Sequence, residues 1–508
     1  MEKTYAVRMK NITKTFGSIV ANSEASLDVY HGEILSLLGE NGSGKTTLMN
    51  MLSGIYFPDS GTIEVNGKEV TIRSPHDALQ LGIGMVHQHF KLVDVFSAVE
   101  NIALGDTKNR YNLAEVSNRV RAICDRYGFE LDPLQKVYDM SVSQKQTLEI
   151  VKVLYRGAEI LILDEPTAVL TPQETARLFQ IIKKMRDDGK AVIIITHKLH
   201  EVLSVSDRVS ILRKGKHIGT VLTKDATEQS LTEMMVGEKV SLNIRRDPPK
   251  NPQERLRIEH LTVKRQDGVT ALSDVSFSVN GGEILGIAGI SGCGQKELLE
   301  SVAGLQPFEE GSSIRFFSPQ GGEQQLLGKS PRKIRELGVS LSFVPEDRLG
   351  MGLVGSMGMT DNMLLRSYTN GSSIIADRSA PRKLAQKVLD ELKVVTPGIS
   401  TPVSRLSGGN VQKVLVGREI ANAPTVLMTA YAVRGLDINT SYTIYNLLNE
   451  QKKNGVAVIY VGEDLDVLLE LCDRIVVLCG GKVNGILNGS EATKEQVGLM
   501  MTNLAGGE

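Results

Sequence analysis

The 508-residue sequence has almost no net charge and only four cysteines. A formal charge of −1 supplies no field that would hold a polyanion, so nucleic acid is not expected as the main partner. The cysteines form no C-x-x-C pair, which argues against both a zinc site and a disulfide framework. We therefore expect buried or idle thiols in a reducing compartment.

Long apolar runs are also missing from the sequence. No stretch approaches the roughly 18 residues that a membrane-spanning helix requires. The first residues, Met1–Ala6, lead into strand-like sequence without an apolar signal segment. Hydrophobic residues make up 41% and charged residues 23%, as in soluble globular domains. If the protein acts at a membrane, other subunits must cross it.

The sequence repeats itself. The segment Gly32–Gly39 recurs as Gly282–Gly289, at an offset of 250 residues. Further along, Met140-Ser141 recurs as Leu406-Ser407 at an offset of 266, and this offset then persists over a long stretch. Such a register indicates a duplicated domain.

The duplication predicts two domains, 1–243 and 255–508, joined by a linker at 244–254. The prolines and charges of the linker are typical of an extended segment. In each copy short apolar strands, such as Ile160–Leu163 and Ala191–Ile195, alternate with amphipathic helices. This alternation predicts an α/β fold with a largely parallel sheet.

A phosphate-binding loop is predicted in the first copy, between the apolar strand Ile34–Leu38 and a helical run. The motif fits G-x-x-x-x-G-K-[ST], whose glycines let backbone N–H groups turn towards phosphate oxygens at a helix N-terminus. Lys45 would neutralise the β- and γ-phosphates, and the Thr46 hydroxyl would bind Mg²⁺. The residues of the motif are Gly39, Glu40, Asn41, Gly42, Ser43, Gly44, Lys45, Thr46 and Thr47.

Two acids follow the apolar strand Ile160–Leu163. A buried strand would deliver Asp164 to the metal and leave Glu165 where it can polarise an attacking water. Two acids after a strand could instead cap the next turn. That alternative does not explain His197, which follows a second apolar strand in the matching position.

These motifs resemble the ATP-binding-cassette (ABC) family over nearly the whole chain, which implies ATP and Mg²⁺ as cofactors. The resemblance implies that each domain has a RecA-like core and a helical subdomain. On this resemblance Gln88 is the Q-loop glutamine, which serves the metal and catalysis, and His197 is the switch histidine that contacts the γ-phosphate. Phe16 resembles the aromatic residue that stacks on adenine, although an aromatic residue there could equally belong to the core. The segment that resembles the signature motif, which binds the γ-phosphate of a nucleotide held by the opposite domain, contains Ser407, Gly408, Gly409 and Asn410.

The second copy lacks the chemistry of the first. Like-charge repulsion from Glu297 and the missing metal ligand should make hydrolysis there negligible. At the two offsets, Lys45 becomes Gln295, Thr46 becomes Lys296, Gln88 becomes Glu346, Asp164 becomes Ala430, Glu165 becomes Tyr431, His197 becomes Glu463 and Phe16 becomes Gln266.

The signature motif shows the reverse pattern, because it is kept in the second copy and lost in the first. The second copy keeps its glycines, whereas the first has Val142 and Ser143 where a backbone should approach phosphate closely. The turn Arg434–Asp437 of the second copy is likewise intact, and its first-copy counterpart is not. Head-to-tail packing explains this pattern, because the first phosphate loop would then face the second signature motif and form one complete site.

The fused pair resembles the tandem ATPases of bacterial importers for simple sugars and nucleosides, and Met85–Phe90 and Ala98–Gly105 look more like the nucleoside branch. This implies a peripheral protein on the cytoplasmic face of the bacterial membrane, with two separate permease subunits and, indirectly, a substrate-binding lipoprotein. The permeases would contact the regions 88–105 and 346–363. Phe90, Leu92, Val93 and Phe96 suit such a groove, or equally the core of a helical subdomain.

Three other functions compete with this one. A pentose or hexose importer ATPase differs from a nucleoside importer only in short motifs, and the cargo is chosen by other subunits. ABC proteins that resemble ribosome factors have two competent sites and a long charged helical linker, whereas the linker here is short and rich in proline. DNA-repair relatives carry zinc-binding cysteines or long coiled-coil insertions, and this sequence has neither. A nucleotide sensor without turnover would not need Glu165 and His197.

Overall fold

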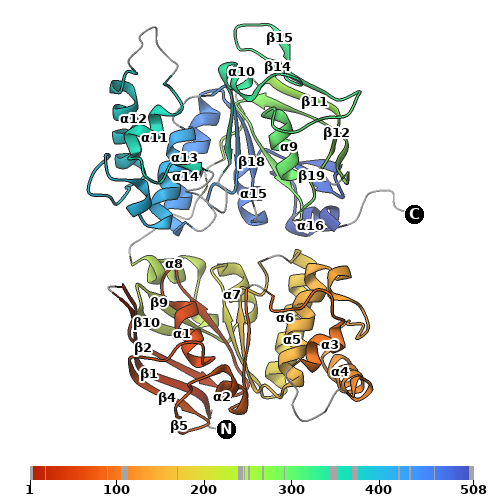
Figure 1. Cartoon of the computed structure of the whole chain (residues 1–508), viewed down its shortest axis with the longest axis vertical. Coiled ribbons are helices and arrows are strands. Elements are labelled where there is room, and N and C mark those ends of the chain that lie inside the picture. Colours follow the sequence, from red (N-terminus) through yellow and green to blue (C-terminus); the bar gives the residue numbers. More distant parts are fainter. Residues whose placement is uncertain are drawn as a thin grey trace. The chain divides into compact units, whose positions relative to one another are not determined.

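The computed structural model divides into two compact units, Met1–Ser241 and Leu242–Glu508, which are described separately (Figure 1). The structure describes residues 4–17, 19–88, 90–104, 112–168, 170–237, 244, 246–249, 252–265, 268–290, 292–343, 352–368, 376–420, 424–433, 436–462 and 464–502, without the side chains of 342 and 343.

The first unit contains two sheets. An antiparallel sheet in the order β2-β1-β4-β5 is built from β1 (Tyr5–Phe16), β2 (Ile19–Tyr30), β4 (Ser60–Val65) and β5 (Lys68–Val70). A second sheet in the order β10-β9-β3-β8-β7-β6 is parallel except for β10. Its strands are β3 (Ile34–Leu38), β6 (Ile83–Val86), β7 (Ile160–Asp164), β8 (Ala191–Ile195), β9 (Arg208–Arg213) and β10 (Lys216–Leu222).

The helices of the first unit are α1 (Lys45–Leu52), α2 (Pro75–Gln80), α3 (Ala98–Ala103), α4 (Leu113–Tyr127), α5 (Val142–Tyr155), α6 (Pro172–Asp187), α7 (Leu199–Val205) and α8 (Glu228–Val236). Helices α3, α4 and α5 pack together, away from the antiparallel sheet (Figure 1). Capping boxes start α3 at Ser97, α5 at Ser141 and α6 at Thr171, so the helix starts follow directly from local sequence.

The second unit repeats this topology. Its antiparallel sheet, in the order β12-β11-β14-β15, contains β11 (Gln253–Lys264), β12 (Thr270–Gly281), β14 (Ser313–Phe317) and β15 (Glu323–Gln325). The other sheet, β16-β17-β18-β13-β19-β20, contains β13 (Ile284–Ala288), β16 (Val339–Phe343), β17 (Val426–Ala430), β18 (Ala457–Val461), β19 (Arg474–Cys479) and β20 (Lys482–Asn488). The helices are α9 (Gln295–Val302), α10 (Pro331–Glu336), α11 (Met359–Leu364), α12 (Ser379–Glu391), α13 (Gly408–Ile420), α14 (Ile438–Lys453), α15 (Leu465–Leu471) and α16 (Lys494–Thr502).

The central parallel strands are buried along their whole length. All five residues of β3, β7 and β8 are buried. One face of the sheet packs against helices α3 to α6, and the other packs against α1 and the antiparallel sheet, so no face is left to solvent. Ile244, inside the predicted linker, is buried in the core of the second unit. The predicted α/β fold with two domains is confirmed.

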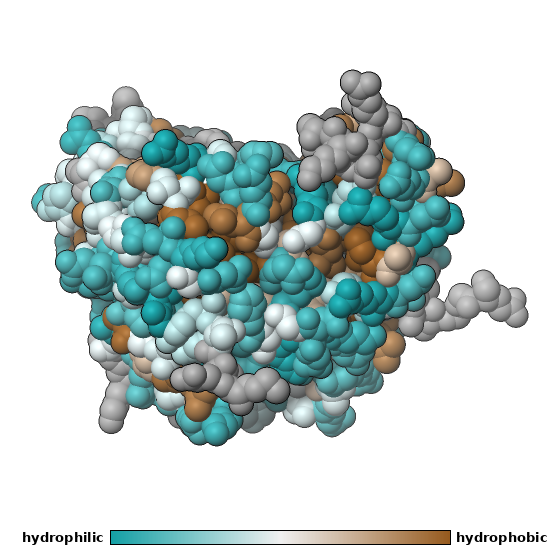
Figure 2. All heavy atoms as spheres, turned by 90° about the horizontal axis from the view of Figure 1, so that it is seen from below, coloured by the Kyte–Doolittle hydropathy of each residue, from teal (hydrophilic) through white to brown (hydrophobic). Residues whose placement is uncertain are grey.

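The surface is mainly hydrophilic on the face shown in Figure 2, where brown apolar areas are interrupted by teal side chains. Among the described residues, no helix has both the length and the apolar character needed to cross a bilayer. The four cysteines are free and buried.

A buried ion pair joins the start of β3 to β9 in the first unit. Glu33 is fully buried, accepts the Tyr30 N–H at 2.7 Å, and pairs with Arg208 at 3.1 Å. The second unit has the same arrangement in Glu283 and Arg474, whose ion pair measures 3.2 Å. The pair therefore belongs to the frame common to both units.

We expect Glu33→Gln to lower the free energy of unfolding of the first unit by about 3 kcal/mol, because it leaves a largely buried guanidinium without its counter-charge. Urea unfolding followed by circular dichroism measures the effect. Glu69→Gln, at an exposed carboxylate on β5, is the control and should leave the midpoint unchanged. Equal midpoints for Glu33→Gln and the native chain would contradict the assignment.

Candidate functional site

The predicted phosphate loop connects the end of β3 to the start of α1. Gly42 and Gly44 have φ angles of 78° and 95°, a left-handed conformation that strains any residue with a Cβ. A Cβ on Gly39 would lie 2.3 Å from the Leu212 carbonyl oxygen, so glycine is required there for close packing. The hydroxyl of Ser43 is buried and has no hydrogen-bond partner among the described residues. The loop thus keeps a polar atom that a ligand oxygen could satisfy.

The Lys45 side chain folds back over this loop. Its ammonium donates hydrogen bonds to the carbonyl oxygens of Gly39 at 2.6 Å and Glu40 at 3.0 Å. Only 7% of Lys45 is exposed, and burial lowers its pKa, partly offset by the charges of Glu165 and Asp164. The ammonium therefore lies inside the loop, where phosphate oxygens would replace the two carbonyls.

The predicted metal ligands Thr46 and Asp164 lie side by side. The Thr46 hydroxyl donates to the Asp164 carboxylate at 3.4 Å, although the two residues are far apart in sequence. Burial, followed by repulsion from Glu165, raises the pKa of Asp164 to about 6. A divalent cation would compensate both effects, so the pair fits Mg²⁺.

Glu165 is held by residues from two other strand ends. Its carboxylate accepts the Gln88 side-chain amide at 3.0 Å on one oxygen and lies 3.0 Å from His197 Nδ1 on the other. The hydrogen bond from His197 lowers the pKa of Glu165, so the carboxylate is ionised at neutral pH. Its backbone φ of 47° is a strained conformation, fixed by an N–H bond to the Ile195 carbonyl at 2.9 Å.

Sequence reasoning missed Glu201, which supports this arrangement. It is 3% exposed, accepts the Thr167 hydroxyl at 2.7 Å and pairs with Lys198 at 3.2 Å. These contacts tie the segment after β7 to the segment after β8, and so fix His197 relative to Glu165. Only the i,i+3 spacing of Lys198 and Glu201 could have signalled the pair.

Phe16 ends β1 and is 42% exposed, so it is not a core residue. The side chain lies at the rim of the unit, as an adenine-stacking residue requires. The residue before it is fixed by Asp59, which accepts the Thr15 N–H and hydroxyl, each at 2.7 Å.

The strand register corrects one correspondence between the two copies. In the first unit Ile12 pairs with Ala25 and Phe16 with Ile19. In the second unit Leu261 pairs with Val275, and the Arg265 N–H bonds to the Val269 carbonyl at 2.8 Å. The counterpart of Phe16 is therefore Arg265 and not Gln266, because the fixed offset of 250 ignores a one-residue shift within the hairpin. Gln266 itself lies outside the described residues.

The second phosphate loop is contacted by side chains that have no counterpart in the first unit. Arg265 pairs with Glu297 on the first turn of α9 at 2.8 Å and donates to the Gly292 carbonyl at 3.3 Å. The Gln295 amide donates to the Ile290 carbonyl at 3.1 Å, in the place of the Lys45 bond to Glu40. Gly292 and Gly294 keep the left-handed φ angles of Gly42 and Gly44, and an uncharged amide stands in the place of the Lys45 ammonium. Glu346, Glu463, Arg434 and Gly435 lie outside the described residues.

The two signature segments also differ in structure. Ser407 precedes α13 and its hydroxyl accepts the Asn410 amide at 2.8 Å, while a Cβ on Gly409 would meet nothing within 4 Å. Gly408, at the first turn of α13, is exposed. In the first unit, Ser141 is closed in a capping box with Gln144. The second segment leaves open space at Gly409, whereas the first has the Val142 and Ser143 side chains in place of the two glycines.

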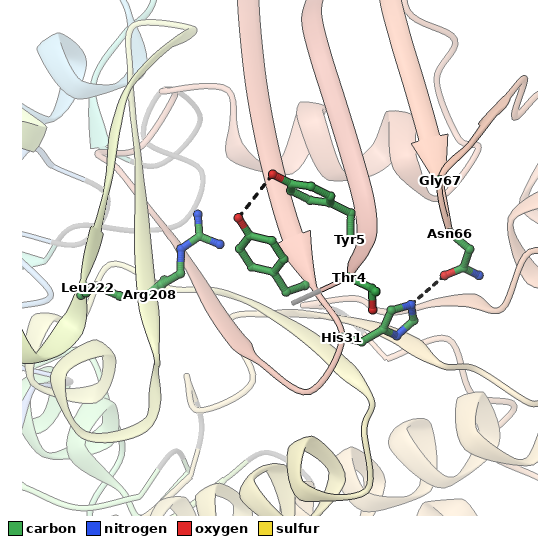
Figure 3. Close-up of a pocket in the computed structure, with 8 residues that line it drawn as sticks. Thr4, Tyr5, His31, Asn66, Gly67, Arg208 and Leu222 are labelled. Carbon is green, nitrogen blue, oxygen red and sulfur yellow. Dashed lines mark hydrogen bonds between the residues drawn. The ribbon is translucent and has the colours of Figure 1, made fainter. Parts of the chain in front are cut away.

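A separate cavity of about 1160 Å³ lies at the opposite end of β1 (Figure 3). It is lined by Thr4, Tyr5, Tyr30, His31, Asn66, Gly67, Arg208 and Leu222. Tyr5 begins β1 and Phe16 ends it, so the length of this strand separates the cavity from the predicted adenine position. The Tyr5 and Tyr30 rings stack on each other at 4.7 Å. This cavity is not part of the phosphate site.

Apart from Phe16 on β1, the structure brings the first-unit candidates to one edge of one sheet. Asp164 ends β7 and Glu165 follows it, while the phosphate loop follows β3, His197 follows β8 and Gln88 follows β6. The carboxyl ends of these strands meet at that edge. Ser407, Gly408, Gly409 and Asn410 belong to the second unit. No group of three or more His, Cys, Asp and Glu side chains suited to a metal occurs in the described part of the chain.

Comparison with known proteins gives the family. The ABC transporter pattern matches residues 23–168 and 272–429. The chain is 42% identical to the guanosine import ATP-binding protein NupO of Bacillus subtilis over 98% of this chain and 97% of that protein. It is 40% identical to the nucleoside import ATP-binding protein NupA of Lactococcus lactis, over 99% of each chain.

Two further similarities are more distant. The ribose import ATP-binding protein RbsA 1 of Rubrobacter xylanophilus is 35% identical, over 97% of each chain. The solved structure of an archaeal ribosome recycling factor is similar in fold, with a TM-score of 0.59 and 16% identity over 92% of this chain and 87% of that one.

The raised pKa of Asp164 predicts proton release when magnesium nucleotide binds. At pH 6 the carboxyl is about half protonated, so binding should release about half a proton, whereas at pH 8 it should release none. The same proton also affects folding stability. Because the folded state holds it more tightly than the unfolded state, the contribution of Asp164 to the free energy of unfolding falls as pH rises from 3.8 to about 6.

Titration calorimetry in buffers of different ionisation enthalpy measures this release. Asp164→Asn should abolish it, and Glu165→Gln should not, because the pKa of Glu165 is lowered. Equal release by the native chain and Asp164→Asn would contradict the assignment.

Proposed function

Because this chain belongs to the ABC transporter family, we propose that it is the ATP-hydrolysing subunit of a nucleoside importer, with one hydrolytic site. The observation that carries the proposal is the Glu165 carboxylate, held between Gln88 and His197 beside Asp164 and the phosphate loop. A structural turn would not need an ionised acid, an amide and an imidazole in contact at the mouth of such a loop.

Each side chain has a role that follows from its position. Lys45 exchanges its two carbonyl partners for oxygens of the β- and γ-phosphates, and Phe16 stacks on adenine. Glu165 accepts a hydrogen bond from the attacking water and orients it, while His197 holds the carboxylate and faces the γ-phosphate. Mg²⁺ held by Thr46, Asp164 and Gln88 would neutralise charge on the phosphate oxygens. The backbone amides and side chains of Gly39–Thr47 enclose the phosphates.

The second unit supplies the opposite half of that site. In this proposal the domains 1–243 and 255–508 pack head to tail, and Ser407, Gly408, Gly409 and Asn410 close over the γ-phosphate. The glycines allow the backbone to approach, and the hydroxyl and amide donate to phosphate oxygens. Arg265 and Glu297 occupy the second phosphate loop, which supports turnover at the first loop alone.

Two permease subunits are the proposed partners, contacted through the segments that follow the Q-loop in each domain. Buried Asn101 fixes one segment, because its amide donates to the Val93 carbonyl at 3.1 Å and its oxygen accepts the Val93 N–H at 2.8 Å. Asn362 makes the same two bonds with Val354 at 3.2 and 2.9 Å. Val93 and Val95 are exposed apolar residues next to this clamp, whereas Leu92 packs into the core.

This partnership would place the protein on the cytoplasmic face of the bacterial membrane, where a substrate-binding lipoprotein acts on it only through the permeases. Nucleoside cargo is supported by the two importer relatives at 40% identity or above. A sugar importer is the second candidate, because the ribose relative matches 97% of the chain at 35% identity.

Head-to-tail closure predicts unequal effects of the same substitution in the two domains. Ser407→Arg should lower ATP hydrolysis by roughly a hundredfold, because the guanidinium fills the γ-phosphate position of the active site. Ser141→Arg faces the silent site and should cost only part of a helix cap, about 1 kcal/mol of stability. The steady-state ATPase rate and the melting temperature of each variant separate the two effects. Comparable losses of turnover would contradict the pairing.

The cargo assignment predicts which ligand stimulates the assembled transporter. Its ATPase rate should rise when the binding protein carries a purine or pyrimidine nucleoside, and much less with pentoses or hexoses, because only the closed binding protein biases the permease. The measurement uses reconstituted membranes, and the ATPase chain alone is the control that should not respond. Stimulation by a sugar only would replace the nucleoside assignment with the sugar one.

A further inference from the structure

An exposed pair of aromatic rings lies at the adenine end of the first unit. The rings of Phe16 and Tyr56 meet edge to face, with centroids 5.2 Å apart and an interplanar angle of 71°. Phe16 is 42% exposed and Tyr56 is 37% exposed. Two exposed rings add little to the hydrophobic core, so core packing does not explain why they are in contact.

The two rings come from segments that are separately anchored. Phe16 ends β1, which Asp59 holds through the Thr15 hydrogen bonds already described. Tyr56 follows α1, and its N–H bonds to the Asn50 carbonyl in that helix at 3.1 Å. Because α1 begins at Lys45, the Tyr56 ring connects the strand end at the adenine position with the helix of the phosphate loop.

The second unit keeps this backbone frame. Gly54 and Gly304 both have a φ of 76°. The Ile55 N–H bonds to Asn50 at 2.8 Å and the Leu305 N–H bonds to Glu300 at 2.8 Å. The counterpart of Tyr56 is therefore Gln306 at the same place in the same turn.

The side chains on that frame are different. Gln306 turns to Glu300, to which its amide donates at 2.6 Å, and Arg265, in the place of Phe16, turns to Glu297. Both aromatic residues are thus absent from the copy whose phosphate loop has lost its lysine. The backbone frame is therefore kept without the aromatic pair, so the pair is not needed to build the turn.

We propose that Tyr56 is a positioning residue for the nucleobase: its edge contact fixes the plane of the Phe16 ring so that one face is presented to adenine. This inference rests on the proposed function, in which Phe16 stacks on the base. Without Tyr56, the exposed Phe16 ring samples several rotamers, and binding must select one of them. Base-dependent affinity then falls, and phosphate affinity does not.

The test is Tyr56→Gln in the full chain, a substitution that the second unit already accommodates in this turn. It should raise the Kd and KM for magnesium ATP roughly three- to tenfold at unchanged kcat, since an aromatic edge contact is lost. Magnesium tripolyphosphate, which has no base, should compete with unchanged affinity. Tyr56→Phe should behave as the native chain, because the ring edge remains.

Two controls separate the possible failures. If Phe16→Ala leaves ATP affinity unchanged, the adenine role proposed for Phe16 is wrong, and the role of Tyr56 is overturned with it. If Phe16→Ala weakens ATP binding and Tyr56→Gln does not, only the present inference is overturned. Equal weakening of ATP and tripolyphosphate by Tyr56→Gln would show a damaged phosphate loop and would also overturn it. Equilibrium dialysis of the nucleotide measures all of these affinities.

Discussion

Parallel strand pairing is the constraint on which this site depends. Residues that are far apart in sequence meet because β3, β8, β7 and β6 are neighbours that run in one direction, so their carboxyl ends share an edge. The hydrogen bond between Thr46 and Asp164, and the two bonds to the Glu165 carboxylate, all cross between these strand ends. Any loss of pairing would separate the groups before it altered any of them chemically.

The duplication provides an internal comparison between fold and chemistry. What both units share, such as the Glu33–Arg208 and Glu283–Arg474 pairs, is needed to build the domain. What only the first unit has, such as the ammonium of Lys45 inside its loop, belongs to the nucleotide site that we propose. Each unit thus serves as a reference for the other, and the comparison needs no other protein.

Much of the fold and the site could be predicted from sequence, for reasons that are local. The phosphate loop, the strand with two acids and the repeat are continuous motifs, so their spacing carries the geometry. The partners of buried groups were not predictable: Glu201 and Asn101 act through contacts that form only after packing. The strand register could not be predicted from a fixed offset either, because a one-residue shift in a hairpin leaves no mark in composition. This shift makes Arg265 the counterpart of Phe16.

The left-handed backbone at Glu165 recurs at Tyr431, where φ is 57° and the N–H bonds to the Val461 carbonyl at 3.0 Å. Tyr431 carries no acid, so catalysis no longer explains the strain, and the exit from the parallel strand does. At this position the two units therefore differ by the exchange of a side chain on the same main-chain path. Such a difference is geometrically reversible, because the path that aims a carboxylate in the first unit is available in the second for evolution or a designer to use.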